Sequence, residues 1–183
     1  GVGLIKDYKK MVTMDFKKID NLVLVIGKTE GHIDQSLFAR SILDEKNGPP
    51  PEVNLFNEKN NGESLLNLIN KDYIQSAHDI SLGGIITAIS KMCIQGNKGI
   101  KLKKANNFVN ELEYLFSEDQ GRYIIEIKPE DLKEVTNLLD KNSVHYDELG
   151  IITDKEMIIN QKTKLTIDEL KSYYTNWLTK YMS

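Results

Sequence analysis

The sequence predicts an α+β protein with three layers, in which a mixed sheet of four or more strands carries helices on both faces. Residues 22–26, Leu-Val-Leu-Val-Ile, form a continuous apolar run closed by Gly27 and typical of a strand buried on both sides. Residues 84–95 place their apolar side chains on one helical face. From residue 122 onward, a strand, a helix and two strands follow one another, as in half of a ferredoxin-like unit.

The remaining elements follow from apolar spacing and from residues that favour helix starts or turns. Pro129 suits the first turn of a helix, and Thr166 with Glu169 forms a capping box. Strands are expected at 22–26, 73–80, 99–103, 122–128, 144–152 and 157–160. Helices are expected at 31–43, 54–70 (with a possible interruption at 61–62), 84–95, 111–116, from 129 and from 166. The three prolines at 49–51 require a loop.

Length and composition indicate a single domain of ordinary composition. The chain has 183 residues, 40% hydrophobic and 28% charged, and 24 basic against 27 acidic residues give a net charge of −3. This charge gives no attraction to nucleic acid or to an anionic membrane, and no run reaches the roughly 18 apolar residues of a membrane span. The single cysteine fits a reducing cytoplasm. We expect residues 1–20 to be an exposed linker, residues 21–183 to be one domain, and the chain to begin within a longer protein, since residue 1 is glycine.

The stretch from residue 76 to residue 96 carries the clearest candidate site. A Ser-Leu-Gly-Gly turn precedes the predicted helix, and Ser81 is expected to cap that helix. Gly83 and Gly84 leave the backbone N–H groups of the first turn unobstructed, and such groups bind anions at the positive end of the helix dipole. The alternative is a tight turn into a core helix. His78 and Asp79 could act as a base with its orienting carboxylate, although adjacent strand residues point to opposite faces, which favours a structural role for one of them.

A second candidate set follows at residues 118–122. The carboxylate of Glu118, the amide of Gln120 and the guanidinium of Arg122 would share one face of an extended segment and could grip a ribose hydroxyl and a phosphate. A sheet edge linked by salt bridges is an equally good interpretation. The histidines are scattered, so no metal site is expected. Cys93 is expected to be a buried thiol, and the aromatic residues after position 172 are expected to pack on the sheet rather than stack on nucleic-acid bases.

Both candidate sets resemble one family. Residues 78–85, His-Asp-Ile-Ser-Leu-Gly-Gly-Ile, resemble the His-Asp-Val-Ser-Asp-Gly-Gly-Leu signature of phosphoribosylformylglycinamidine synthase, in its synthetase subunit. Residues 115–122, Leu-Phe-Ser-Glu-Asp-Gln-Gly-Arg, are similar to the family's Leu-Phe-Gly-Glu-Ser-Gln-x-Arg. Weaker similarities at residues 1–5, 22–29 and 50–53 follow in the family's order, so the resemblance runs nearly the whole length.

The resemblance implies the fold of the C-terminal domain of aminoimidazole ribonucleotide synthetase, and it makes this chain the second C-terminal half-domain. The whole enzyme would convert formylglycinamide ribonucleotide, ATP and glutamine-derived ammonia to formylglycinamidine ribonucleotide in purine biosynthesis. Its catalytic histidine, its magnesium ligands and most nucleotide contacts would lie in upstream half-domains, and a glutaminase subunit or domain would supply ammonia. This segment would then contain no catalytic residue, no metal and no cofactor of its own, and would be inactive when isolated.

The family's substrate-gripping Glu-Ser-Gln corresponds here to residues 118–120, with Asp119 in place of a serine that faces phosphate. This carboxylate adds repulsion, so the half-site is expected to be structural or to bind an auxiliary nucleotide. We favour a vestige whose geometry is kept for folding, with Arg122 as the cation nearest to any bound anion. The candidate phosphate or nucleotide half-site comprises His78, Asp79, Ser81, Gly83, Gly84, Glu118, Gln120 and Arg122. Alternatives are the matching half of aminoimidazole ribonucleotide synthetase, selenophosphate synthetase or thiamine-phosphate kinase, and a stand-alone interaction module.

Overall fold

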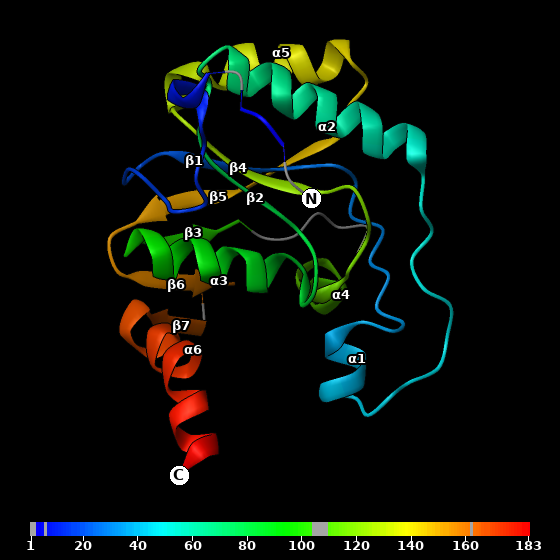
Figure 1. Cartoon of the computed structure of the whole chain (residues 1–183), viewed down its shortest axis with the longest axis vertical. Coiled ribbons are helices and arrows are strands. Elements are labelled where there is room, and N and C mark those ends of the chain that lie inside the picture. Colours follow the sequence, from blue (N-terminus) through cyan, green and yellow to red (C-terminus); the bar gives the residue numbers. More distant parts are fainter. Residues whose placement is uncertain (1–2, 6, 104–109, 162) are drawn as a thin grey trace.

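A computed structural model describes residues 3–5, 7–103, 110–161 and 163–183, and it contains one seven-stranded mixed sheet (Figure 1). The strands are β1 (Leu22–Ile26), β2 (Ile74–Asp79), β3 (Gly99–Leu102), β4 (Tyr123–Ile127), β5 (Tyr146–Thr153), β6 (Glu156–Ile159) and β7 (Thr163–Thr166). Their order is β2-β4-β1-β5-β3-β6-β7, and every neighbouring pair is antiparallel except β3 and β6. The predicted α+β class with a mixed sheet is confirmed.

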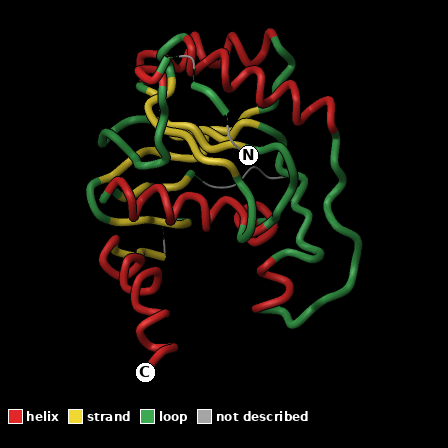
Figure 2. The backbone as a smooth tube through the Cα atoms, in the orientation of Figure 1, coloured by secondary structure: helices red, strands yellow, loops and turns green. Residues whose placement is uncertain are grey.

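Helices cover both faces of this sheet, as Figures 1 and 2 show. The α-helices are α1 (Leu37–Ser41), α2 (Leu55–Asn70), α3 (Gly84–Gly96), α4 (Glu111–Phe116), α5 (Leu132–Lys141) and α6 (Ile167–Met182). Two 3-10 turns, Tyr8–Lys10 and Pro129–Asp131, complete the set. Helices α2 and α5 lie on one face, and α3 and α4 lie on the other. The molecule therefore has three layers.

Strand β1 is an inner strand of the sheet with both faces covered, and this position accounts for its continuous apolar sequence. It pairs with β4 on one side and with β5 on the other. Val23 and Val25 point into the apolar core beneath α3, whereas Leu24 and Ile26 point into the core beneath α2 and α5. All four side chains are fully buried. A strand covered on both faces cannot alternate apolar and polar residues.

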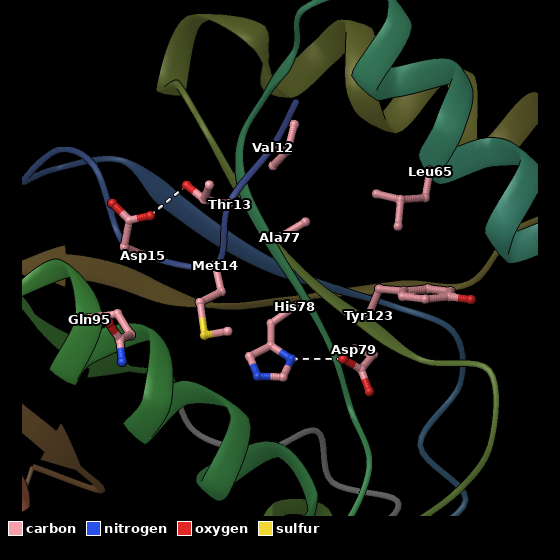
Figure 3. Close-up of a pocket in the computed structure, with 10 residues that line it drawn as sticks. All are labelled: Val12, Thr13, Met14, Asp15, Leu65, Ala77, His78, Asp79, Gln95 and Tyr123. Carbon is pink, nitrogen blue, oxygen red and sulfur yellow. Dashed lines mark hydrogen bonds and ion pairs between the residues drawn. The ribbon is translucent and has the colours of Figure 1, made fainter. Parts of the chain in front are cut away.

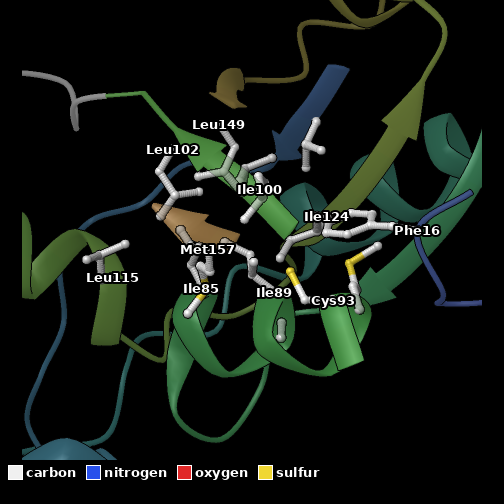
Figure 4. Close-up of a cluster of buried hydrophobic side chains, with 14 of the residues drawn as sticks. Phe16, Ile85, Ile89, Cys93, Ile100, Leu102, Leu115, Ile124, Leu149 and Met157 are labelled. Atoms are coloured by element: carbon white, nitrogen blue, oxygen red, sulfur yellow. The ribbon is translucent and has the colours of Figure 1, made fainter. Parts of the chain in front are cut away.

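Helix α3 fills the larger of the two cores. Ile85, Ile89, Met92 and Cys93 are fully buried and face apolar residues of the sheet, including Ile100 of β3 (Figure 4). The predicted helix and its apolar face are therefore confirmed. Burial raises the pKa of the Cys93 thiol to about 12, in agreement with the expected buried cysteine.

Several predicted elements differ in the structure. The helix expected at 31–43 shrinks to α1, because Gly31 (φ 83°) and Gln35 (φ 62°) adopt left-handed backbone conformations that a right-handed helix excludes. Helix α2 passes through residues 61–62 without interruption. Strand β7 was not predicted. The condition under which Glu118, Gln120 and Arg122 would share one face is not met, because residues 117–122 form a loop that enters β4 rather than an extended strand.

Most of the described residues before position 21 are exposed, with one clear exception. Residues 1–2 and 6 of the predicted linker lie outside the described residues. Phe16 is fully buried in the α3 core, so an exposed linker is wrong for that part of the segment. The backbone N–H of Ala77 in the outer strand β2 donates to the carbonyl of Thr13 at 3.1 Å. The boundary at residue 20 stays a prediction.

Candidate functional site

The turn before α3 is built by two glycines in left-handed conformations. Gly83 (φ 83°) is the N-cap of α3 and Gly84 (φ 70°) is its first residue. A Cβ atom on Gly84 would lie 2.6 Å from the carbonyl oxygen of Ser117, so only glycine fits this close approach. The prediction that Ser81 caps the helix is wrong: its carbonyl accepts the N–H of Gly84 at 3.0 Å, and its side chain is exposed. Because Gly83 is the N-cap, the helix begins two residues later than a cap at Ser81 would require.

The carboxylate of Glu118 lies at the start of α3, where the sequence predicted an anion. Its Oε1 accepts the N–H of Gly83 at 2.8 Å and the N–H of Leu37, the first residue of α1, also at 2.8 Å. Both groups stand at helix N-termini, where a negative charge is stabilised. One side chain of the chain thus supplies the anion to two helix starts. The structure therefore brings Glu118 to the Gly83–Gly84 turn. Its carboxylate lies where the sequence predicted a bound anion.

Asp119 plays a parallel role in the next loop. Its carboxylate accepts three consecutive backbone N–H groups, those of Glu30 and Gly31 on Oδ2 (3.0 and 3.1 Å) and that of His32 on Oδ1 (3.2 Å). The residue is nearly buried. The sequence suggested that this carboxylate would only repel a phosphate. The structure shows that it organises the backbone after β1, a role that a serine at this position could not fill with one oxygen.

Arg122 points inward rather than toward a ligand. Its side chain is fully buried, and it donates to the carbonyls of Asp119 (3.1 Å) and Ser117 (2.8 Å) and to the hydroxyl of Thr29 (3.0 Å). Burial lowers the pKa of Arg122, and the negative charge of Asp119 opposes that shift. The guanidinium therefore fixes the loop that carries Glu118 and Asp119. Thr29 was missed by sequence reasoning, which took it only as part of a family match.

Gln120 leaves this cluster and faces a polar cleft of about 590 Å³. Its Nε2 atom donates to the carbonyl of Glu118 at 3.4 Å, and the side chain is exposed. Four carboxylates and two histidines line the same cleft together with Lys28, whose amine contacts Glu30 at 2.7 Å. Glu118, Gln120 and Arg122 thus point in three directions, and they do not share one face.

His78 and Asp79 lie at a different cleft, of about 730 Å³, between residues 12–15, β2 and α2 (Figure 3). The Nδ1 atom of His78 lies 3.0 Å from Oδ1 of Asp79, so the two side chains meet although they are adjacent on the strand. The Nε2 atom is buried and has no hydrogen-bond partner among the described residues. A catalytic base needs an accessible nitrogen, and this one is not accessible.

A further buried carboxylate, Glu126 of β4, was not singled out from the sequence. It accepts the N–H groups of Lys17 (2.8 Å) and Lys18 (3.0 Å), the amide of Asn21 (2.7 Å) and the hydroxyl of Ser76 (2.7 Å). The residue is fully buried. A single acidic residue within the apolar strand Tyr-Ile-Ile-Glu-Ile was the available signal. This carboxylate holds the chain before β1 against the sheet.

Within the described ranges, no group of three or more histidine, cysteine or acidic side chains is placed to hold a metal ion. None of the helices in the described part of the chain is long and apolar enough to cross a membrane.

Comparisons with known proteins agree with this architecture. Subunit PurL of phosphoribosylformylglycinamidine synthase from Pelagibacter ubique (strain HTCC1062) is 68% identical over 182 residues, which is all of this chain and 25% of the relative. The same subunit from Bartonella bacilliformis is 37% identical over the same shares of both chains. The chain therefore spans about a quarter of the length of the curated relatives it matches.

Solved structures share the fold. Thermotoga maritima PurL complexed with FGAR superposes with a TM-score of 0.72 over 89% of this chain and 30% of that chain, at 16% identity. Escherichia coli HypE, a hydrogenase maturation protein, gives 0.61 over 85% of this chain and 51% of that chain, at 13% identity. Residues 18–160 match the family described as AIR synthase related protein, C-terminal domain. Since that match covers most of the chain and the resemblance at residues 78–85 and 115–122 pointed the same way, the chain belongs to this family of AIR synthase related C-terminal domains.

Proposed function

We propose that this chain is the last C-terminal domain of a phosphoribosylformylglycinamidine synthase, the ATP-dependent ligase that converts formylglycinamide ribonucleotide and ammonia to formylglycinamidine ribonucleotide. The observation that carries the proposal is the 68% identity to a PurL subunit along the whole chain. The upstream domains of the same polypeptide would be its first partners, and a glutaminase subunit or domain would supply the ammonia. A cytoplasmic location is proposed, which the single, buried Cys93 fits.

The domain itself is proposed to be non-catalytic. In the turn proposed for a substrate phosphate, the N–H of Gly83 already binds Glu118 at 2.8 Å and the N–H of Gly84 binds the carbonyl of Ser81 at 3.0 Å. Arg122, the cation expected beside that phosphate, is buried and satisfied by three other acceptors. As the resemblance implies, ATP and its magnesium ions are proposed to bind mainly in the upstream domains of the enzyme. This domain would support the fold of the active assembly.

The half-site is therefore proposed to be a vestige in which Glu118 replaces the ligand. Titration of the ¹⁵N-labelled chain with inorganic phosphate tests this directly. The amide signals of Gly83 and Gly84 should not shift saturably in the native chain, whereas in a Glu118→Ala variant the freed N–H group of Gly83 should respond to phosphate. Saturable shifts in the native chain at low millimolar phosphate would show a working site and overturn the vestige.

The function of the whole protein is tested by exchange of the matching segment. These 183 residues would replace the corresponding quarter of the Pelagibacter synthetase subunit. The hybrid should form formylglycinamidine ribonucleotide from ammonia, ATP and formylglycinamide ribonucleotide at a rate within about tenfold of the parent. A folded hybrid without activity would contradict the proposal. The isolated chain should show no thermal shift with ATP or ADP, whereas saturation at about 100 times the dissociation constant would stabilise it by about 2.7 kcal/mol.

A further inference from the structure

Among the residues that the structure describes, helix α6 is attached to the domain by its first turn and a half. Ile167 is buried, and its N–H donates to the carbonyl of Lys155 at 3.0 Å. Thr166 and Glu169 form the predicted capping box, and the amine of Lys171 donates to the side chain of Asn97 at 2.7 Å. Beyond this point the helix runs away from the sheet and from α3 (Figures 1 and 2). The remaining three turns project from the domain.

The projecting turns carry their large apolar side chains on one half of the helix. Two rows with a spacing of four residues contain them, and five polar residues occupy the other half. The apolar residues, each at least half exposed in the described structure, are Tyr173, Tyr174, Trp177, Leu178, Tyr181 and Met182. We call this set the α6 face. The expectation that these aromatic residues pack on the sheet is wrong.

The α6 face is large for a surface exposed to water. Its exposed fractions run from 52% for Leu178 to 80% for Tyr181. With roughly 150–250 Å² available for each aromatic side chain, the face presents about 700 Å². The largest apolar patch of a typical monomer is about 300–600 Å², and one side of a standard protein interface buries about 800 Å². Tyrosine, tryptophan and methionine are also the residues enriched at the centres of interfaces.

The comparisons indicate which partner this face suits. The match to the general C-terminal domain family ends at residue 160, before α6 begins. The PurL relatives, in contrast, align along the whole chain, so α6 is shared with them. Three quarters of each relative lies outside the matched segment and belongs to the same polypeptide. A surface on that polypeptide is held at a high effective concentration by the covalent connection.

We propose that the α6 face docks on the upstream part of the synthetase polypeptide. This proposal rests on the proposed function. The partner surface is apolar, because the α6 face contains no acidic side chain and the one basic side chain on these turns, Lys180, lies in the polar half. Docking buries Trp177 and Tyr181 and fixes the angle at which this domain meets the rest of the enzyme. Because the attachment of the helix in the described structure lies near Ile167 and Lys171, its remaining turns are free to make this contact.

Hydrogen–deuterium exchange tests the docking without using activity as the readout. Peptides from residues 172–182 would be followed in the isolated chain and in the full-length hybrid described above. In the hybrid, exchange should slow at least tenfold relative to the isolated chain. A double variant, Tyr173→Ser with Trp177→Ser, should lose this protection, whereas Thr175→Ser with Thr179→Ser on the polar half should keep it. Circular dichroism of the isolated variants confirms that the domain still folds.

Three outcomes would overturn the proposal, and a fourth separates it from the proposed function. Equal exchange in both proteins would show that the upstream polypeptide does not cover the helix, even if the hybrid is active. Protection of the isolated chain that rises with concentration, together with a dimeric mass, would assign the face to a second copy. Protection that appears only after a glutaminase subunit is added would assign it to that subunit. An inactive hybrid with a protected helix would contradict the proposed function and leave the docking supported.

Discussion

Replacing Glu118 with alanine tests whether its carboxylate stabilises the two helix starts. The bond to Gly83 is partly buried and the bond to Leu37 is exposed. A hydrogen bond to a charged group contributes about 1.5–3 kcal/mol, and the exposed one lies at or below the lower limit because water can replace the carboxylate. We therefore expect the free energy of unfolding to fall by about 3 kcal/mol. The midpoint of thermal unfolding should fall by about 6–12 °C for a chain of this length.

Urea unfolding followed by circular dichroism measures this change, provided that the slope of the transition is unaltered. Glu118→Gln keeps a neutral acceptor in place and should lose about half as much stability, because hydrogen bonds to charged groups are about twice as strong as neutral ones. Glu63→Ala is the matched control, since that carboxylate is 65% exposed and lies 3.8 Å from Lys59. The control should change stability by less than about 0.5 kcal/mol. A Glu118→Ala variant as stable as the control would refute the capping role.

Three further changes test the core and the glycine turn. Ile89→Ala removes a fully buried side chain from the α3 core and should cost about 2–5 kcal/mol in urea unfolding, whereas a near-neutral result would make α3 peripheral. Gly84→Ala places a Cβ atom 2.6 Å from the carbonyl oxygen of Ser117, on a residue whose φ is 70°. The free energy of unfolding should fall by at least about 2 kcal/mol, and an unchanged thermal midpoint would contradict the close approach. Burial raises the pKa of Cys93 to about 12, so above about pH 9 the unfolded thiol loses a proton that the folded thiol keeps. The free energy of unfolding should therefore fall from about pH 9 toward pH 12. Burial of this thiol would be contradicted if the folded chain reacted with iodoacetamide at pH 8 as fast as the urea-unfolded chain.

The sequence predicted the layers well because burial leaves a regular pattern. The run at residues 22–26 has no polar position since both of its faces are covered. The apolar spacing of α3 likewise reflects one side packed on the sheet. The helix expected at 31–43 failed for a local reason, because left-handed conformations at Gly31 and Gln35 do not show in apolar spacing.

Only part of the predicted site comes together: Glu118 reaches the turn at Gly83, whereas His78 and Gln120 line other clefts. Residues 83–84 and 118–122 do come together, as the two signatures suggested. Which acceptor each donor finds is decided by contacts distant in sequence, such as Arg122 with Thr29 and Asp119 with the backbone of residues 30–32. Residue type shows that a carboxylate can accept backbone N–H groups, but it does not show which N–H groups the fold will bring to it.

The contact between residue 13 and the outer strand has a consequence for solubility. Strand β2 is the last strand on its side of the sheet, and a free edge offers unpaired backbone groups to other molecules. The carbonyl of Thr13 occupies the N–H of Ala77 on that edge, and the carboxylate of Glu126 holds the following residues Lys17 and Lys18 in place. At the opposite edge, β7 is only four residues long and carries the exposed Lys164. Backbone of the chain itself thus occupies part of the β2 edge, and the short length of β7 and the charge of Lys164 disfavour intermolecular strand pairing at the other edge.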